Sequence, residues 1–149
     1  MRSFLIITFF SVLTFLSVAA DTHARKVYFN SLDIEQTPIQ GEFYRPSTRS
    51  PNSAILMMHG CSGLYKKSGK IKTNSAAWIK RFTKWGYAVL AVDGFTPRGF
   101  RSMCNKRKRP LHSLDDRPFD AYGGLAWLKN QPGIKKHQII LIGLSLIHI

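Results

Sequence analysis

The chain has 149 residues, of which 44% are hydrophobic and 20% are charged. That length and composition suit one globular domain with a core of its own, and they exclude a disordered or fibrous protein. Lys and Arg number 22 against 8 Asp and Glu, so that the formal net charge is +14.

The positive charge is gathered in short runs, at residues 66–72, 80–81 and 106–109. A basic surface of this kind can hold an anionic ligand, but no motif of a nucleic-acid-binding protein accompanies it. We therefore expect a basic protein whose partners are not nucleic acids. An anionic lipid or an envelope polymer is the better candidate for an incidental partner.

The first 20 residues have the three parts of a secretory signal peptide. Met1-Arg2 is a positively charged start, and residues 4–18 are apolar apart from Ser and Thr. Val18-Ala19-Ala20 is a small-residue cleavage site, with Thr22-His23-Ala24 as a second candidate. The apolar run is shorter than the roughly 20 residues that a membrane-spanning helix needs. We therefore expect cleavage and export, to a periplasm or out of the cell, with no stable membrane anchor afterwards.

Two strands are predicted to open the mature chain, at residues 26–29 and 39–44. The second alternates apolar and polar residues, which is typical of a half-exposed antiparallel strand. A third strand, at 54–59, is a continuous apolar run, as in strands that are covered on both faces. It ends in a tight turn, Gly60-Cys61-Ser62-Gly63.

A helix is predicted at residues 75–85, with Ser75 as its N-terminal cap and apolar side chains on one face. A buried strand follows at 87–92. A second helix begins at Asp116, and the last strand covers 138–142. Buried strands that alternate with helices predict an α/β domain, with a mostly parallel sheet flanked by helices.

The two cysteines, Cys61 and Cys104, are interpreted in the light of export. In an oxidising compartment such a pair can form a structural disulfide, and closing a loop of this length would stabilise the fold by roughly 4 kcal/mol. Neither cysteine has the paired spacing of a zinc site. We expect a disulfide, with two reactive thiols as the alternative.

Two turns that follow predicted parallel strands carry the candidate chemistry. Gly143-Leu144-Ser145 after a buried strand is the first half of a nucleophile elbow, Gly-x-Ser-x-Gly. Ser145 would then be the nucleophile. The backbone N–H groups of Cys61 and Leu146 would stabilise the oxyanion that forms during acyl transfer.

Three blocks make the chain resemble exported members of the dienelactone hydrolase family, in the α/β-hydrolase superfamily. They are HGCSGL at 59–64, GYAVLAVDGFTPRG at 86–99 and DAYGGLAWL at 120–128. The resemblance covers about residues 27–143. It implies an α/β-hydrolase fold and hydrolysis of ester, lactone or related acyl bonds in a small molecule. It also implies a Cys or Ser nucleophile with Asp and His, and no metal or organic cofactor.

The resemblance also assigns roles to single residues and predicts a fragment. Cys61 matches the oxyanion loop through its N–H, so its thiol is not the nucleophile, and Ser145 stands at the nucleophile position. The Asp and His of the triad follow the nucleophile in chain order in this fold. We therefore expect 25–143 to be the N-terminal portion of a domain that is truncated at its C-terminus, and inactive as it stands.

The last six residues, 144–149, depart from the family. Small residues and glycines should follow the nucleophile, but Leu146-Ile147-His148 stands there. The segment is what a common transposase-derived library adapter encodes, read as ctg-tct-ctt-ata-cac-atc. We expect an adapter read-through, in which case Ser145 matches Gly-x-Ser by accident.

A second function remains open from the sequence. The protein can be a non-catalytic exported binding protein that uses the same fold, with its basic surface for anionic ligands, because a fold does not fix a function. The oligomeric state and the substrate are not predicted.

Overall fold

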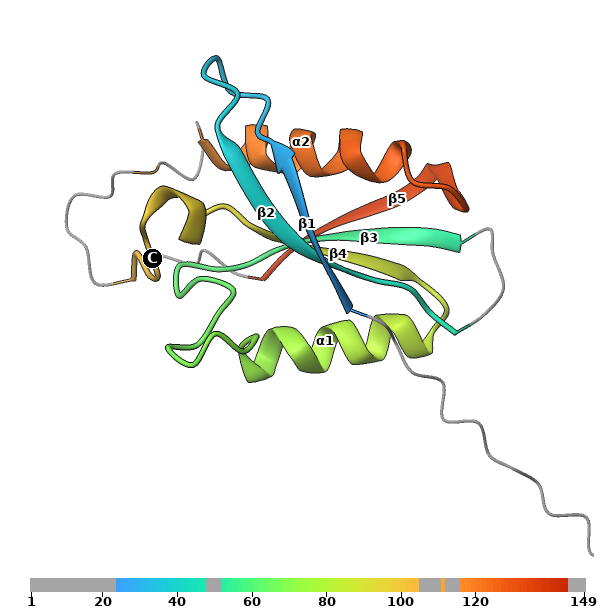
Figure 1. Ribbon diagram of the computed structural model, residues 1–149. Helices are drawn as coiled ribbons and strands as arrows, with labels where there is room; N and C mark the ends of the chain where they lie inside the picture. Colours follow the sequence, from blue (N-terminus) through green and yellow to red (C-terminus); the bar gives the residue numbers. More distant parts are fainter. Residues whose placement is uncertain (1–23, 48–51, 105–110, 112–115, 145–149) are drawn as a thin grey trace, which may run out of the picture.

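The computed structural model describes residues 24–47, 52–104, 111 and 116–144 (Figure 1). The expected signal peptide, at 1–20, lies outside the described residues. Ser145, Leu146 and all of the expected tail after Leu144 lie outside them as well.

Five strands form a single sheet in the order β1-β2-β4-β3-β5. The first two strands pair antiparallel, β2 also pairs antiparallel with β4, and β4, β3 and β5 are mutually parallel. The bounds are β1 (Ala24–Asn30), β2 (Pro38–Tyr44), β3 (Asn52–Met58), β4 (Ala88–Asp93) and β5 (Ile134–Gly143). The α/β class expected from the alternation of strands and helices is confirmed.

Helices cover both faces of the sheet, which makes a three-layer arrangement (Figure 1). α1 (Thr73–Lys84) lies on one face and α2 (Asp116–Lys129) on the other, and a short 3-10 helix, η1 (Thr96–Arg98), follows β4. Each face has its own hydrophobic core. Leu56 and Leu90 point toward α2, whereas Ile55 and Val89 point toward α1, which explains the unbroken apolar runs of the central strands.

Two local expectations were wrong. α1 begins after Lys72, and Ser75 is buried inside its first turn instead of capping it. The strand β2 is more buried than its alternating pattern predicts, because it lies inside the sheet between β1 and β4.

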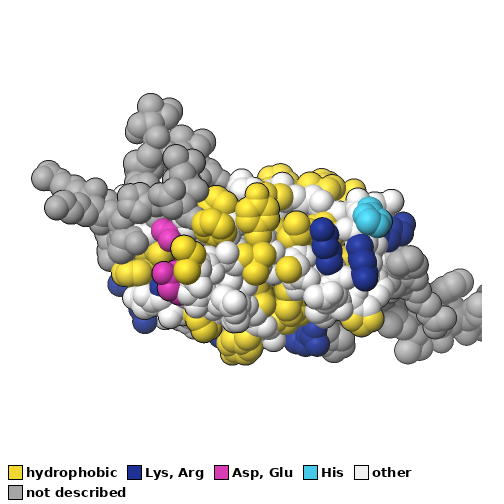
Figure 2. Space-filling model, turned by 90° about the horizontal axis from the view of Figure 1, so that it is seen from above, with side chains coloured by type: hydrophobic (Ala, Val, Ile, Leu, Met, Phe, Trp, Pro, Cys, Tyr) yellow, Lys and Arg dark blue, Asp and Glu magenta, His cyan; other side chains and the backbone are white. Residues whose placement is uncertain are grey.

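Strand β5 forms one edge of the described sheet. Ile140 and Leu141, which lie on its opposite faces, are 47% and 59% exposed. On the side of α2, hydrophobic side chains gather over the surface (Figure 2), and Phe119 and Tyr122 are exposed there. The apolar run of this strand is therefore only partly covered. No helix in the described part of the chain is long and apolar enough to cross a membrane.

Candidate active site

The turn after β3 and the end of β5 lie side by side. Met58 pairs in parallel register with Gly143, and the N–H of Leu144 donates to the carbonyl of Met58 at 2.8 Å. The two turns that the sequence singled out are thus neighbours at the carboxyl edge of the parallel strands. That edge is where open α/β sheets hold their ligands.

The turn at 60–63 is fixed by backbone contacts. The N–H of Gly63 donates to the carbonyl of Gly60 at 3.0 Å, and Gly63 has a φ of 80°. A Cβ on Gly63 would lie 2.2 Å from the carbonyl oxygen of Arg101, so the close approach of the loop after β4 requires glycine here. The carbonyl of Cys61 accepts the N–H of Met103 at 2.7 Å. Among the described residues, the N–H of Cys61 donates to no acceptor.

A disulfide joins Cys61 to Cys104, with the two Cα atoms 4.9 Å apart. It links the turn after β3 to the loop that follows β4 and η1. The thiol of Cys61 is thereby occupied, whereas no described residue accepts its backbone N–H.

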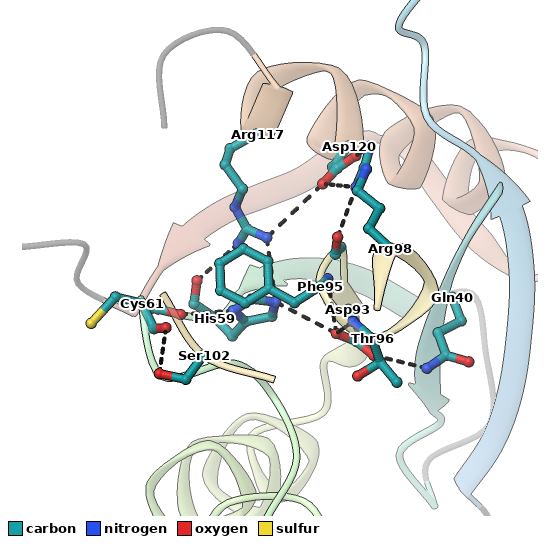
Figure 3. A network of polar contacts seen from close by, with 12 residues as sticks. Gln40, His59, Cys61, Asp93, Phe95, Thr96, Arg98, Ser102, Arg117 and Asp120 are labelled. Atoms are coloured by element: carbon teal, nitrogen blue, oxygen red, sulfur yellow. Dashed lines mark hydrogen bonds and ion pairs between the residues drawn. The ribbon is translucent and has the colours of Figure 1, made fainter. Parts of the chain in front are cut away.

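His59 is held in the interior by its neighbours (Figure 3). Its side chain is 1% exposed, and its Nδ1 lies 2.8 Å from the carbonyl of Gly60. Because a carbonyl only accepts, Nδ1 carries the proton, and Nε2 faces a guanidinium nitrogen of Arg117 at 3.3 Å. Burial, followed by the charge of Arg117, lowers the pKa of His59 to about 4. The imidazole is neutral and serves to structure the turn.

Asp93, at the end of β4, organises the next turn. It is fully buried, and its Oδ1 accepts the N–H groups of Phe95 at 3.2 Å and Thr96 at 3.1 Å. Its Oδ2 accepts the side-chain amide of Gln40 at 2.8 Å. One carboxylate therefore fixes β4 to η1 and to β2.

A second buried carboxylate, Asp120 of α2, binds Arg98 through both of its oxygens, at 2.9 and 3.0 Å. Arg98 also reaches Asp33 at 3.2 Å, and Arg117 lies 3.9 Å from Asp120. Burial raises the pKa of the Asp120 carboxyl, and Arg98 opposes part of that rise. Three carboxylates, two guanidinium groups and a neutral imidazole therefore make one connected network that supports the turn (Figure 3).

Local sequence patterns did not show how the members of this network are paired. Arg117 and Asp120 are three residues apart on a predicted helix, which is the one signal that could have paired them. Asp33 and Gln40 come from distant segments and carry no such signal. Of the predicted site residues, Cys61 lies in the turn after β3. Ser145 and Leu146 lie outside the described residues. The described residues hold no group of three His, Cys, Asp or Glu side chains that could bind a metal ion.

Comparison with known proteins gives no sequence family. No family model matches the chain. A pentatricopeptide repeat-containing protein of Arabidopsis thaliana is 32% identical over 108 residues, which cover 68% of this chain and 12% of that protein. Because the match spans so little of the plant protein, it assigns neither a family nor a function.

Solved structures give a clear answer on the fold. The α/β-hydrolase GrgF from Penicillium sp. sh18 superposes with a TM-score of 0.61 at 18% identity, over 83% of this chain and 38% of that chain. The chain has an α/β-hydrolase fold. A dienelactone hydrolase-like promiscuous phosphotriesterase, P91 from metagenomic libraries, gives a TM-score of 0.59 at 22% identity, over 82% and 48% of the two chains. Esterase Est22 gives 0.58 at 20% identity, over 84% and 35%.

The chain spans less than half the length of each of these α/β-hydrolases. At these identities the likeness concerns the fold alone. The expected fold class is confirmed.

Proposed function

We propose that this chain is the N-terminal part of an exported hydrolase of the dienelactone hydrolase type, which acts on ester, lactone or related acyl bonds of a small molecule. One observation carries the proposal. The turn between β3 and α1 has an N–H without an acceptor among the described residues, and it lies beside the end of β5. These are the places where α/β-hydrolases put an oxyanion donor and the nucleophile.

The reaction would be acyl transfer. A nucleophile at position 145 attacks the substrate carbonyl, and the negative oxygen of the tetrahedral intermediate accepts hydrogen bonds from the N–H of Cys61 and that of residue 146. The leaving alcohol departs to give an acyl-enzyme, which water then hydrolyses to the acid. The triad acid and base would come from the chain after the elbow. His59 is not the base, because its Nδ1 donates to Gly60 and its Nε2 faces Arg117.

The first test is turnover. The chain as it stands should hydrolyse p-nitrophenyl acetate no faster than its Ser145→Ala variant, whereas the product of the full open reading frame should be active. A chain that outperforms its Ser145→Ala control would contradict the fragment proposal. A full-length product that binds ligands without turnover would favour the non-catalytic alternative.

The second test separates the N–H of Cys61 from its thiol. In the full-length protein, Cys61→Ala with Cys104→Ala removes the disulfide and keeps the N–H, whereas Cys61→Pro with Cys104→Ala removes both. The proline pair should lose a further 10²–10³-fold in kcat, on the order of one oxyanion donor. Equal activity of the two pairs, at matched melting temperatures, would exclude this N–H as a donor.

Export is part of the proposal. The disulfide between Cys61 and Cys104 supports it, because such bonds persist in oxidising compartments. Expression in a bacterium followed by N-terminal sequencing checks it, and the exported form should begin after Ala20. Retention of Met1 on a cytosolic product would contradict it.

A further inference from the structure

A hollow lined by basic side chains lies next to the turn at 60–63. It consists of two adjoining cavities, of about 190 and 500 Å³, which share Tyr65, Lys66, Lys67 and Arg101. Lys26 borders one cavity, and Lys72 borders the other. Five cations therefore surround one hollow, which we call the basic hollow.

Three separately anchored segments bring these cations together. The loop after β3 folds back on itself, with the N–H of Lys66 donating to the carbonyl of Lys70 at 2.8 Å. Lys72 stands at its base, where its N–H donates to the carbonyl of Leu64 at 2.9 Å. The loop that carries Arg101 is fastened to the turn by the disulfide, and β1 supplies Lys26. In Figure 1 the loops after β3 and after β4 lie at the same end of the sheet.

The described carboxylates offset only a small part of the positive charge of the basic hollow. In the described parts of the chain, the ion pairs of Asp33, Asp93 and Asp120 are with Arg98, Arg117 and His59, and no carboxylate comes within 4.0 Å of the five cations. Glu42 stands across the β1–β2 pair from Lys26 without such a contact, but its carboxylate lies beside the hydroxyl of Tyr65, so one negative charge borders the basic hollow. The cations thus repel one another, and an anion would relieve that repulsion.

Several uncharged groups of the basic hollow can donate hydrogen bonds as well. The hydroxyls of Ser62, Thr73 and Ser102 line the larger cavity. The hydroxyl of Tyr65 is buried, and this burial together with the neighbouring carboxylate of Glu42 raises its pKa, while Lys26 Nζ lies 5.8 Å from the centre of the Tyr65 ring. Ammonium, guanidinium and hydroxyl groups can all donate, so the lining suits a ligand that brings oxygen acceptors and negative charge.

We propose that the basic hollow binds a polyvalent phosphate group carried by a ligand of this protein. A single carboxylate would leave most of five positive charges unmatched, whereas a phosphate monoester or a pyrophosphate brings two or three negative charges and several acceptor oxygens. Lysine ammonium groups bind phosphate as point charges, and arginine adds paired N–H donors. The inference goes beyond acyl hydrolysis and does not depend on it.

The test is direct binding by the full chain. Inorganic pyrophosphate is titrated calorimetrically at 50 and 300 mM NaCl, and a parallel arm measures flotation with phosphatidylcholine vesicles that contain phosphatidic acid. Pyrophosphate binding should weaken with salt. Binding in the first arm alone would identify a soluble phosphate ligand, and binding in both would include a phosphomonoester lipid. Binding in neither would overturn the proposal.

Matched variants locate the site. Lys66→Gln with Lys67→Gln should weaken pyrophosphate binding at least tenfold, and so should Arg101→Gln. Lys80→Gln with Lys84→Gln removes the same charge from the exposed surface of α1 and should change binding less than twofold. Equal losses in both lysine pairs, or acetate binding as tight as that of pyrophosphate, would overturn the proposal. Because no step involves turnover, an inactive enzyme leaves the result intact.

Discussion

Replacing Gly123 by alanine tests how closely α2 approaches the segment after β1. In a helix interior without other contacts, this change stabilises by roughly 0.5–1 kcal/mol. Here the new Cβ would lie 2.2 Å from the carbonyl oxygen of Asn30, and 3.2 Å from the Cα of Ser31. Both obstacles are backbone atoms, so the helix must move away by about an ångström. Overpacking costs about 1–3 kcal/mol, and backbone obstacles that cannot rotate away place the cost near the upper end of that range. After the helix gain is subtracted, we expect a net loss of about 2 kcal/mol.

Gly124 provides the matched control, because it lies on the same helix and would gain the same helix propensity. Its Cβ would meet the methyl groups of Leu56 at 2.8 Å and Val92 at 3.1 Å, which are ends of side chains. Leu56 also borders a cavity of about 180 Å³ into which it can turn. Gly124→Ala should therefore change the free energy of unfolding by less than about 1 kcal/mol.

Urea unfolding followed by tryptophan fluorescence measures both variants, and Trp127 of α2 reports from the helix concerned. Gly123→Ala should also lower the melting temperature by about 8 °C for a domain of this size. A Gly123→Ala variant as stable as the parent protein, or a larger loss for Gly124→Ala, would refute the reasoning.

Three further changes test the polar interior. The pKa of His59 is about 4 in the folded protein and about 6.5 when it is solvated, so the unfolded chain takes up the proton first as the pH falls. The free energy of unfolding should then drop by about 3 kcal/mol between pH 6.5 and 4, which urea unfolding measures. The same dependence on pH in His59→Gln would contradict this assignment. Asp120→Asn leaves Arg98 and the buried Arg117 short of a carboxylate and should cost about 3 kcal/mol by the same assay. A similar loss in the exposed Glu35→Gln control would count against the network. Serine at both Cys61 and Cys104 should cost about 4 kcal/mol, and a melting temperature that a reductant leaves unchanged in the parent protein would contradict that value.

The central strands were predictable because both of their faces are covered. β3 and β4 show this directly, since Ile55 packs toward α1 and Leu56 toward α2. For β5 the same kind of apolar run predicted full burial, yet Leu141 is more than half exposed. A run of apolar residues indicates that a strand is suited to burial on both faces. The described elements cover β5 only in part, so the expected burial is incomplete.

The polar network was not predictable from local patterns. Its members lie in the β1–β2 loop, after β3, at the end of β4, in η1 and on α2. Which charge meets which depends on how these elements pack. The resemblance pointed to the turn that holds Cys61, because that turn is a contiguous block of residues that can be recognised directly in the sequence. It gave no indication that Arg98 bridges Asp33 and Asp120, which are 87 residues apart in the chain.

The disulfide also decides what a protease can do to this protein. It closes a loop that contains α1, β4 and the exposed lysines 66 and 67. Trypsin cutting after either lysine would leave the two pieces covalently joined, with β3 and β4 still adjacent in the sheet. The nicked chain would migrate as one band on a gel without reductant and as two bands with it. Cleavage at its most lysine-rich exposed loop therefore need not release a fragment or dismantle the sheet.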